Sequence, residues 1–586
     1  MNNTPEVLLG ANPGMNLDIY RFEGLICQIT AYDLADVVPA LQQIESFVRE
    51  GAYAAGFISY EAAQAFDIAL TTQELHGFPL LWFGVFRERR LVSMDDCTES
   101  SDSRTYMIST WQSDVCREEY LSNVDKIRDY IAAGDVYQVN YTFRETCSFS
   151  GDARQYFREL YRAQTTPFSA FIDLDRFSIL SASPELFFKL DEGVLTVRPM
   201  KGTAKRGASI DDDKEIVAGL LGNEKERAEN LMIVDLLRND LGRVSENGSV
   251  TVNSLFDVET LGTVHQMTST VSSRLRVEVG LVDLFRALFP CGSITGAPKR
   301  RAMEIIAEME SSPRRLYTGC IGYFAPGMQQ AVFSVAIRTV LIDKQSGRGE
   351  LGVGSGITWY SEPDAEFEEC LAKGLFAQEM APEFNLIESF LYEEGNGFFL
   401  FDRHLDRLAQ SASYFGFSFD SNSVRRAVED FGRTIDGNSK VRLLLSRDGS
   451  LALEQTPIVA ANGACDARIG LAGTPVDSTN PFLYHKTSNR ALYLCELEKR
   501  PDCLDVIFVN ERGEVTEGVN HNIVARLDGL LLTPPVCCGL LPGTFRAELL
   551  ASGEIEERVI MLSDLTRAEE VYLVNSVRRW RRVRLV

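Results

Sequence analysis

Apolar residues follow two different spacings along this 586-residue chain, and each spacing predicts a type of element. In residues 116–133, Tyr120, Val124 and the apolar residues after them fall at helical spacing, which predicts a helix that ends at Gly134. In residues 135–142 apolar and polar residues alternate, which predicts a strand.

The same patterns occur at other places between residues 62 and 341. Further strands are predicted at 78–85, 169–174, 186–190, 194–197 and 332–341. Further helices are predicted at 62–69, 213–219, 225–244 and 299–309. Because these elements do not alternate regularly as strand and helix, the class is α+β.

The pattern changes character near residue 382. A helix over 366–376 is followed by a proline, and a hairpin is predicted from 386–391 and 398–401, with a helix at 404–414. We therefore expect a first domain at 1–380, with an N-terminal part at 1–110 and a core at 111–380, and a second domain at 384–586. The polar run at 95–103 is expected to be a surface loop.

Composition excludes several classes of protein. The net charge of −24 argues against a nucleic-acid binder, which would present a basic face. No apolar run approaches the ~18–20 residues of a membrane span, and no signal peptide is visible, so the expected place is the cytoplasm. The twelve Cys are expected to be reduced thiols, and the five His form no zinc motif.

One lysine and two glutamates suggest chemistry. Lys201 lies between Pro199 and Gly202, where a desolvated amine could act as a nucleophile, although a solvated lysine on a surface turn is the ordinary alternative. Glu229 and Glu369 lie on two predicted helices and could converge on a hard cation, or could simply be solvated.

Five stretches in order resemble the chorismate-utilising enzyme family, over roughly residues 115–378. They are residues 183–187, 198–203, 227–243, 291–299 and 354–373. The resemblance implies a large β-sandwich-like core with helices. Within that family, lysine at the position of Lys201 is typical of the aminodeoxychorismate synthases. Members that add water carry lysine where this chain has Gln138, so glutamine there fits ammonia as the incoming group.

The resemblance also implies roles for residues of the first domain. Lys201 would attack C2 of chorismate, and Glu185 would act as general acid and then base. Glu229 and Glu369 would hold Mg²⁺. The chorismate site would be lined by Gly202, Thr203, Tyr317, Arg338, Gly354, Gly356 and Lys373.

One motif departs from the family pattern. Many relatives have histidine where this chain has Gln266, and His265 stands one place earlier, so neither is given a catalytic role. No stretch resembles a glutaminase domain, so ammonia would come from a separate glutamine amidotransferase subunit or from free ammonium.

Residues 384–586 resemble a second family, the class IV pyridoxal-phosphate enzymes, which have a two-subdomain α/β fold. The resemblance rests on Asp402–Leu408, the surroundings of Lys486 and Glu517, and residues 539–546. It departs at Val524, where an aromatic residue is usual.

In this second family a lysine holds the cofactor. Lys486 would bind pyridoxal 5'-phosphate and then move the proton, while Glu517 would pair with the ring nitrogen. Arg407 and the N–H groups of Thr544 and Phe545 would hold the phosphate. Relatives of this family usually form dimers, so a homodimer is possible.

The two resemblances together imply a bifunctional enzyme that makes 4-aminobenzoate from chorismate for folate. The first domain would aminate chorismate, and the second would be an aminodeoxychorismate lyase that eliminates pyruvate. Three alternatives remain open here: an amino acid aminotransferase as the second domain, an anthranilate-type synthase as the first, or one domain that only binds partners.

Overall fold

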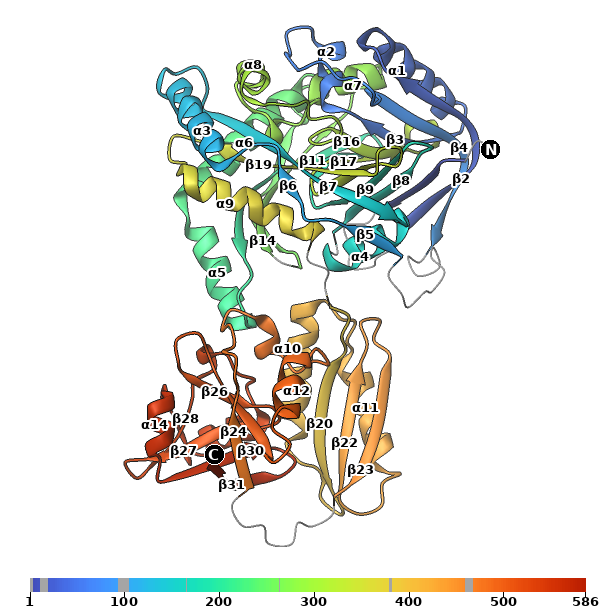
Figure 1. Cartoon of the computed structure of the whole chain (residues 1–586). Coiled ribbons are helices and arrows are strands. Elements are labelled where there is room, and N and C mark those ends of the chain that lie inside the picture. Colours follow the sequence, from blue (N-terminus) through green and yellow to red (C-terminus); the bar gives the residue numbers. More distant parts are fainter. Residues whose placement is uncertain are drawn as a thin grey trace. The chain divides into compact units, whose positions relative to one another are not determined.

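A computed structural model of the chain describes residues 4–10, 19–92, 105–164, 166–262, 264–378, 382–458 and 467–586. The polar run at 95–103 lies outside these ranges. The chain divides into two compact units (Figure 1). Unit 1 comprises Met1–Lys205 and Val217–Ala381, and unit 2 comprises Arg206–Ile216 and Pro382–Val586.

Unit 1 is built on antiparallel strands that pair in one continuous series. The order of neighbours is β13-β14-β11-β10-β17-β16-β3-β4-β2-β1-β8-β9-β18-β19-β7. The bounds are β1 Glu6–Gly10, β2 Ile19–Ala31, β3 Tyr53–Ile58, β4 Leu81–Val92, β7 Gln138–Gly151, β8 Phe168–Asp173, β9 Phe177–Ser183, β10 Leu186–Asp191, β11 Val194–Arg198, β12 Met200–Lys205, β13 Thr251–Thr260, β14 Val264–Arg274, β16 Cys320–Phe324, β17 Gln330–Val335, β18 Thr339–Asp343 and β19 Arg348–Ile357.

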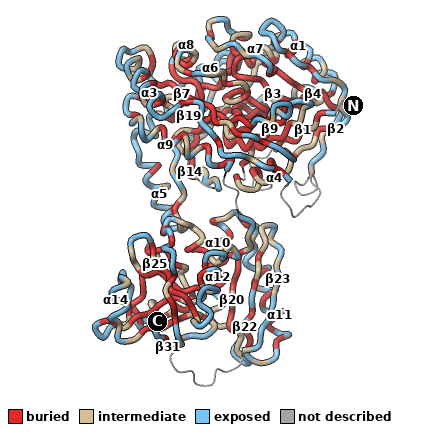
Figure 2. The backbone as a smooth tube through the Cα atoms, viewed as in Figure 1, coloured by how far each residue is buried: buried red, intermediate tan, exposed pale blue. Residues whose placement is uncertain are grey.

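This series folds back on itself to make a sandwich. Alternate residues of one strand face different cores: Val7 and Leu9 of β1 join the apolar cluster between the layers, whereas Leu8 joins the cluster under the helices. The central strands are therefore buried on both faces: every residue of β9 and all but the last of β8 are buried, and Figure 2 shows the centre of unit 1 in red. The predicted β-sandwich-like core with helices is confirmed.

Helices cover both outer faces of the sandwich. One face packs against α1 Leu34–Arg49, α6 Glu224–Gly242 and α7 Leu281–Leu288. The other packs against α3 Arg117–Ala132, α4 Ala153–Gln164, α8 Lys299–Met309 and α9 Pro363–Gly374. The helices predicted at 116–133, 225–244 and 299–309 are confirmed as α3, α6 and α8.

Several predicted elements of unit 1 are wrong in extent. The strand predicted at 78–85 is β4, which begins at Leu81 and continues to Val92, and that predicted at 135–142 is β7, which begins at Gln138 and continues to Gly151. The run at 332–341 forms two strands, β17 and β18, separated by a turn in which Arg338 has a φ of +48°. The apolar run is unbroken across that turn, so alternation gives no sign of it. The helix predicted at 62–69 is shorter, because α2 covers Ala63–Phe66 and the chain becomes extended at Asp67.

Unit 2 has two sheets. The first is antiparallel, in the order β21-β20-β22-β23, and packs on α10 Phe401–Phe415 and α11 Ser421–Gly432. Its strands are β20 Leu386–Glu393, β21 Gly397–Phe398, β22 Ser439–Leu445 and β23 Leu451–Pro457. The predicted hairpin and the helix after it are confirmed.

The second sheet of unit 2 mixes parallel and antiparallel pairs. Its order is β26-β25-β24-β31-β30-β27-β28-β29, and β26 also pairs with β27, so six strands form a closed ring of neighbours. The strands are β24 Ala467–Leu471, β25 Asp505–Val509, β26 Val515–Gly518, β27 Asn522–Leu527, β28 Leu530–Thr533, β29 Glu556–Glu557, β30 Glu570–Asn575 and β31 Arg579–Leu585; the helices are α12 Ala491–Glu498, α13 Thr544–Ala551 and α14 Leu562–Arg567.

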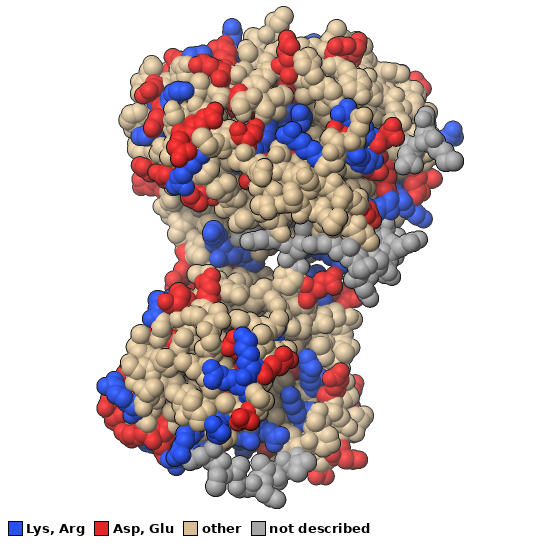
Figure 3. All heavy atoms as spheres, viewed as in Figure 1, with Lys and Arg blue, Asp and Glu red and all other residues tan. Residues whose placement is uncertain are grey.

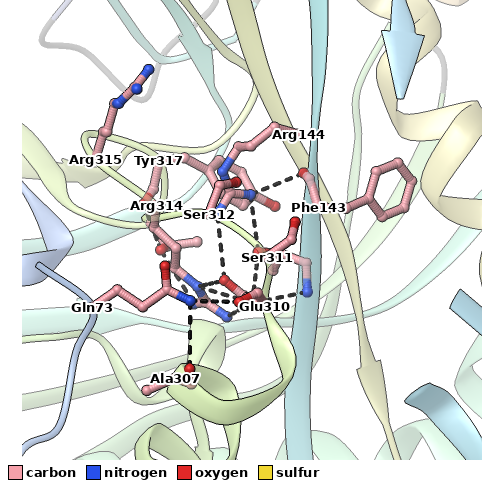
Figure 4. Close-up of polar contacts among 12 residues, drawn as sticks. Gln73, Phe143, Arg144, Ala307, Glu310, Ser311, Ser312, Arg314, Arg315 and Tyr317 are labelled. Atoms are coloured by element: carbon pink, nitrogen blue, oxygen red, sulfur yellow. Dashed lines mark hydrogen bonds and ion pairs between the residues drawn. The ribbon is translucent and has the colours of Figure 1, made fainter. Parts of the chain in front are cut away.

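A buried ionic network lies inside unit 1 (Figure 4). The Glu310 carboxylate lies between the guanidinium groups of Arg144 and Arg314, and the three side chains are 3%, 2% and 1% exposed. Arg314 also donates to the carbonyl of Ile294 at 2.9 Å and to that of Asn140 at 2.6 Å. One side chain therefore joins β7 to the segment that follows α7.

The surface carries charges of both signs. Figure 3 shows acidic and basic side chains interspersed over the visible face. Among the residues that the structure describes, no helix is long and apolar enough to cross a membrane.

We expect Arg314→Met to lower the free energy of unfolding of unit 1 by about 3–5 kcal/mol, because it leaves Glu310 underpaired in the interior. Chemical denaturation followed by tryptophan fluorescence measures this. Arg300→Met is the control, since Arg300 lies on α8 with its side chain 69% exposed. Equal denaturation midpoints for the two variants would contradict the assigned role.

Candidate active sites in the two units

Lys201 lies on a bulge in strand β12. Met200 pairs with Thr268 of β14, and Thr203 pairs with Gln266, so β12 has one residue more than its partner between these pairs. A bulge of this kind changes the direction of a side chain. Gly202 has a φ of +91°, a conformation that favours glycine, and Gln266 holds it by donating from Nε2 to its carbonyl at 3.0 Å.

Glu185 follows β9 and is 3% exposed. Ser293, in the short 3-10 helix Gly292–Ile294, donates to Glu185 Oε1 at 2.6 Å. Burial raises the pKa of Glu185 to about 7, against the smaller opposing effects of Ser293 and of the Lys201 charge. At neutral pH this carboxyl can therefore hold or release a proton.

The Lys201 amine has an environment that favours its neutral form. Burial lowers its pKa from the ordinary value, and the charge of Lys373 acts in the same direction, although Glu229 opposes them. A neutral amine is the nucleophilic form of lysine. Lys201 thus has a lowered amine pKa beside a carboxyl, Glu185, whose pKa is raised.

Three glycines line one face of β19. A Cβ at Gly352 would lie 2.2 Å from the Tyr317 ring, one at Gly354 would lie 2.5 Å from Thr142, and one at Gly356 would lie 3.1 Å from Lys201 Nζ. Side chains on this face would therefore fill the space beside the lysine. Gly352 was not among the predicted site residues. Its i, i+2, i+4 spacing with Gly354 and Gly356, which places all three on one face of the strand, was the signal that could have found it.

Gln138 points at the same place. A Cβ at Gly356 would come within 2.2 Å of its Nε2. Gln138 is 1% exposed, and within the described ranges neither its Oε1 nor its Nε2 has a hydrogen-bond partner. A buried amide without a partner is unusual, and a polar ligand beside Lys201 would satisfy it.

The two glutamates predicted for metal binding lie on α6 and α9, and both their charges act on Lys201. Lys225 lies 4.0 Å from Glu229, and Lys373 lies 2.7 Å from Glu369. Burial raises the pKa of Glu229. Burial acts in the same direction on Glu369, but Lys373, Lys201 and Lys225 together outweigh it and lower the pKa of that carboxyl.

Two more glutamates, one helical turn before Glu229 and Glu369, were not predicted from the sequence. Glu226 and Glu366 precede Glu229 and Glu369 by three residues, and the charge of each acts on Glu229. The repeated i, i+3 spacing was the available signal.

The remaining predicted substrate residues lie around the same strands. Lys373 donates to the Gly354 carbonyl at 3.0 Å, and Thr203 donates to Gln266 at 2.9 Å. Arg338 donates to Gln164 at 3.0 Å, and burial lowers its pKa to about 10. Burial raises the pKa of Tyr317 to about 12.

In unit 2, the half-buried Lys486 and the buried Glu517 form a second pair of an amine and a carboxyl. Burial lowers the pKa of Lys486 to about 7, and the charges of Arg490 and Arg407 add to that effect. Burial also raises the pKa of Glu517 to about 7, while Arg490 opposes it. Tyr493 donates to Glu517 at 3.0 Å.

Arg407 and the start of α13 come together through a chain of contacts. Arg407 makes two 2.8 Å hydrogen bonds to Glu388, and Glu388 also lies 2.7 Å from His404 Nδ1. His404 Nε2 lies 3.1 Å from Thr544 Oγ1. Arg407 and His404 hold the pKa of Glu388 well below its ordinary value, even though burial acts the other way.

The first N–H groups of α13 are available to a ligand. The N–H groups at a helix start have no intrahelical acceptor, and in the described part of α13 the first such bond runs from Ala547 to Gly543 at 2.8 Å. Sequence reasoning found Arg407, Thr544 and Phe545 but missed the connecting groups Glu388 and His404. The three-residue spacing of His404 and Arg407, which places both on one face of α10, was the signal that could have found His404.

Comparison with known proteins finds two family matches along the chain. Residues 16–379 match the model of the chorismate binding enzymes, and residues 385–586 match that of amino-transferase class IV. The first match covers more than half of the chain, so the chain belongs to the chorismate-binding enzyme family.

Two curated relatives are similar in sequence to unit 1. Aminodeoxychorismate synthase component 1 of Klebsiella aerogenes is 44% identical over 288 residues, which are 49% of this chain and 63% of the relative. That of Escherichia coli (strain K12) is 43% identical over 269 residues, 46% of this chain and 58% of the relative. The chain thus spans less than two thirds of the length of either relative.

A solved structure shows the same fold. Anthranilate synthase component I from Streptococcus pneumoniae TIGR4 superposes with a TM-score of 0.55 at 24% identity, covering 63% of this chain and 93% of that one.

The raised pKa of Glu185 has a measurable effect on stability. The folded state keeps the proton up to about pH 7, whereas the unfolded chain loses it near 4.5. Unfolding therefore releases a proton between these values, so the contribution of Glu185 to stability falls as pH rises through this window. Between pH 4.5 and 7, wild type should lose about 3 kcal/mol relative to Glu185→Gln.

Denaturation midpoints at several pH values measure that difference. Glu118→Gln is the control, because Glu118 is exposed on α3. If the difference between wild type and Glu185→Gln does not change with pH, Glu185 has an ordinary pKa.

Proposed function

We propose that this chain makes 4-aminobenzoate from chorismate, for folate, in two steps. Unit 1 replaces the C4 hydroxyl of chorismate by an amino group, and unit 2 then eliminates pyruvate. The observation that carries the first step is the half-buried Lys201 amine on its bulge, with a depressed pKa and an acidic partner in Glu185. The similarity to aminodeoxychorismate synthase component 1 supports it.

In the first step the Lys201 amine adds at C2 of chorismate, both ring double bonds shift by one position, and the C4 hydroxyl leaves. Glu185 in its protonated form gives that hydroxyl a proton, so water departs. Ammonia then adds at C4, both double bonds shift back, and Lys201 leaves as the amine, while the Glu185 carboxylate takes the proton that the new C4 ammonium group loses. The net change is chorismate plus ammonia to aminodeoxychorismate plus water.

The free amide of Gln138 supports ammonia as the incoming group. Its carbonyl oxygen can accept a hydrogen bond from ammonia, and its buried position beside Lys201 keeps it close to the ring. The similarity to proteins named component 1 supports a separate glutamine amidotransferase subunit as the source of ammonia.

The carboxylates of α6 and α9 fit Mg²⁺ completed by substrate. In the described ranges no three His, Cys, Asp or Glu side chains form a ready-made metal cluster. Mg²⁺ is commonly held by one or two carboxylates plus oxygens of the substrate. Glu229 and Glu369 would hold it, and the ion would neutralise a carboxylate of chorismate.

Unit 2 fits pyridoxal 5'-phosphate. Lys486 is a half-buried amine and Glu517 a buried carboxyl, and α13 offers free N–H groups beside Arg407. A Cβ at Gly543 would lie 1.9 Å from Asn522 Oδ1, so only glycine lets the helix start approach β27 here. The cofactor would supply a ring that withdraws electrons from the carbon bearing the amine.

Around that ring the residues of this chain would bind, orient and move protons. Glu517 would pair with the ring nitrogen, and Arg407, Thr544 and Phe545 would hold the phosphate. Lys486, with its pKa near 7, can take the C4 proton of aminodeoxychorismate at neutral pH. Loss of that proton and of pyruvate leaves 4-aminobenzoate, and aromatisation drives the step.

Product analysis by mass spectrometry tests the proposal. With chorismate, ammonium, Mg²⁺ and pyridoxal phosphate, wild type should yield 4-aminobenzoate and pyruvate. Lys486→Ala should accumulate aminodeoxychorismate, because it retains unit 1 and lacks the proton carrier of unit 2. Anthranilate as the main product would refute the assignment of unit 1, and normal 4-aminobenzoate from Lys486→Ala would refute that of unit 2.

A further inference from the structure

A short segment of unit 2 comes from an unexpected part of the sequence. Residues 206–216 lie between Lys201 and Glu229, inside the stretch that matches the chorismate binding enzymes. Their contacts place them in unit 2 with residues 382–586. Unit 2 therefore contains residues 206–216, which lie outside the class IV match at 385–586.

Arg206 and Tyr414 of α10 hold each other by reciprocal contacts. Arg206 donates to the Tyr414 carbonyl at 2.7 Å, and its guanidinium lies 3.8 Å from the centre of the Tyr414 ring. The Tyr414 hydroxyl donates in return to the Gly207 carbonyl at 2.7 Å. A cation over an aromatic ring and two hydrogen bonds fix this tyrosine in position.

Asp213 completes the arrangement. Its carboxylate accepts from Arg206 Nη2 at 2.5 Å and from the Gly207 N–H at 2.7 Å. The Arg206 and Asp213 side chains are only 9% and 11% exposed. The ion pair and the bond to the Gly207 N–H therefore join Arg206, Gly207 and Asp213 into one unit that contacts α10 through Tyr414.

The fixed tyrosine lies against the neighbour of the cofactor lysine. The Tyr414 and His485 rings have centres 4.4 Å apart, and His485 also lies 3.0 Å from the Ser411 hydroxyl on α10. His485 directly precedes Lys486, whose carbonyl accepts from Ile387 at 2.8 Å. The backbone of Lys486 is thus held between β20 on one side and the packing of His485 on the other.

The same segment also supports the partner of Glu517. Ala208 packs on the apolar cluster that contains Tyr484 and Tyr493. Tyr493 is the residue whose hydroxyl donates to Glu517.

We propose that Arg206, Gly207 and Asp213 are a positioning element of the second active site, which fixes Tyr414 and His485 and through them the backbone of Lys486. The inference rests on the proposed function in that Lys486 is taken as the lysine that binds pyridoxal phosphate. It adds that residues 382–586 do not make this site alone. Arg206 does not touch substrate or cofactor, and acts through its neighbours.

The test uses full-length variants loaded with pyridoxal phosphate. Arg206→Gln should release the cofactor about tenfold faster and turn over supplied aminodeoxychorismate about tenfold more slowly, which is the loss expected for one charged hydrogen-bonded contact. Arg206→Lys should recover part of both, since it keeps the charge. Amination of chorismate should change less than twofold in either variant.

Two further variants make the test specific. Tyr414→Phe keeps the ring but loses the hydrogen bond to Gly207. It should therefore release the cofactor faster than wild type, by a smaller factor than Arg206→Gln does. Lys214→Gln is the matched control, because Lys214 is 71% exposed in the same segment and pairs with an exposed Asp211. It should behave as wild type.

The inference is overturned if Arg206→Gln releases cofactor at the rate of Lys214→Gln, or if its amination activity falls as far as its lyase activity. Failure of the proposed function would look different. In that case wild type itself would bind no pyridoxal phosphate or would not convert aminodeoxychorismate. If wild type binds the cofactor but catalyses a different reaction, the rate of cofactor release by Arg206→Gln still tests the positioning element.

Discussion

One buried carboxylate between two guanidinium groups sets the geometry of unit 1. Glu310 pairs with Arg144 and Arg314 where all three side chains are almost completely buried. Charges in such a place are tolerated only when their hydrogen bonds are satisfied. Arg314 meets that requirement by reaching the Ile294 and Asn140 carbonyls, which follow Ser293 and Gln138 by one and two residues. The network therefore ties together the two segments that carry the polar partners of the Lys201 site.

Burial is also the main cause of the chemistry in both units. It raises the pKa of Glu185 and of Glu517 to about 7, and it lowers those of Lys201 and Lys486. In each unit the pKa of an amine is lowered and that of a carboxyl is raised, so both move toward neutral pH, where a group can most readily both give and take a proton. Glu388 shows the opposite case, because burial is outweighed by the Arg407 charge together with the interactions of His404, and these keep the pKa of Glu388 low and its carboxylate ionised.

Much of this could be predicted from the sequence where the signal is local. Helices α3, α6, α8 and α10 follow apolar periodicity, and the glycines of β19 follow strand periodicity. The bulge at Lys201 was not predictable, because it is defined by pairing with β14, more than sixty residues away. Ser293 was missed for the same reason, since its partner Glu185 is 108 residues distant. No local pattern shows that residues 206–216 pack in unit 2, because that depends on Tyr414.

The central claim is that Lys201 forms a covalent bond with the substrate ring. Peptide mass spectrometry of the protein incubated with chorismate and Mg²⁺, with ammonium withheld, tests it most directly. The account predicts that the peptide containing Lys201 gains the mass of chorismate less one water, and that added ammonium discharges this adduct as aminodeoxychorismate. An unmodified Lys201 under these conditions, together with undiminished amination by Lys201→Ala, would contradict it.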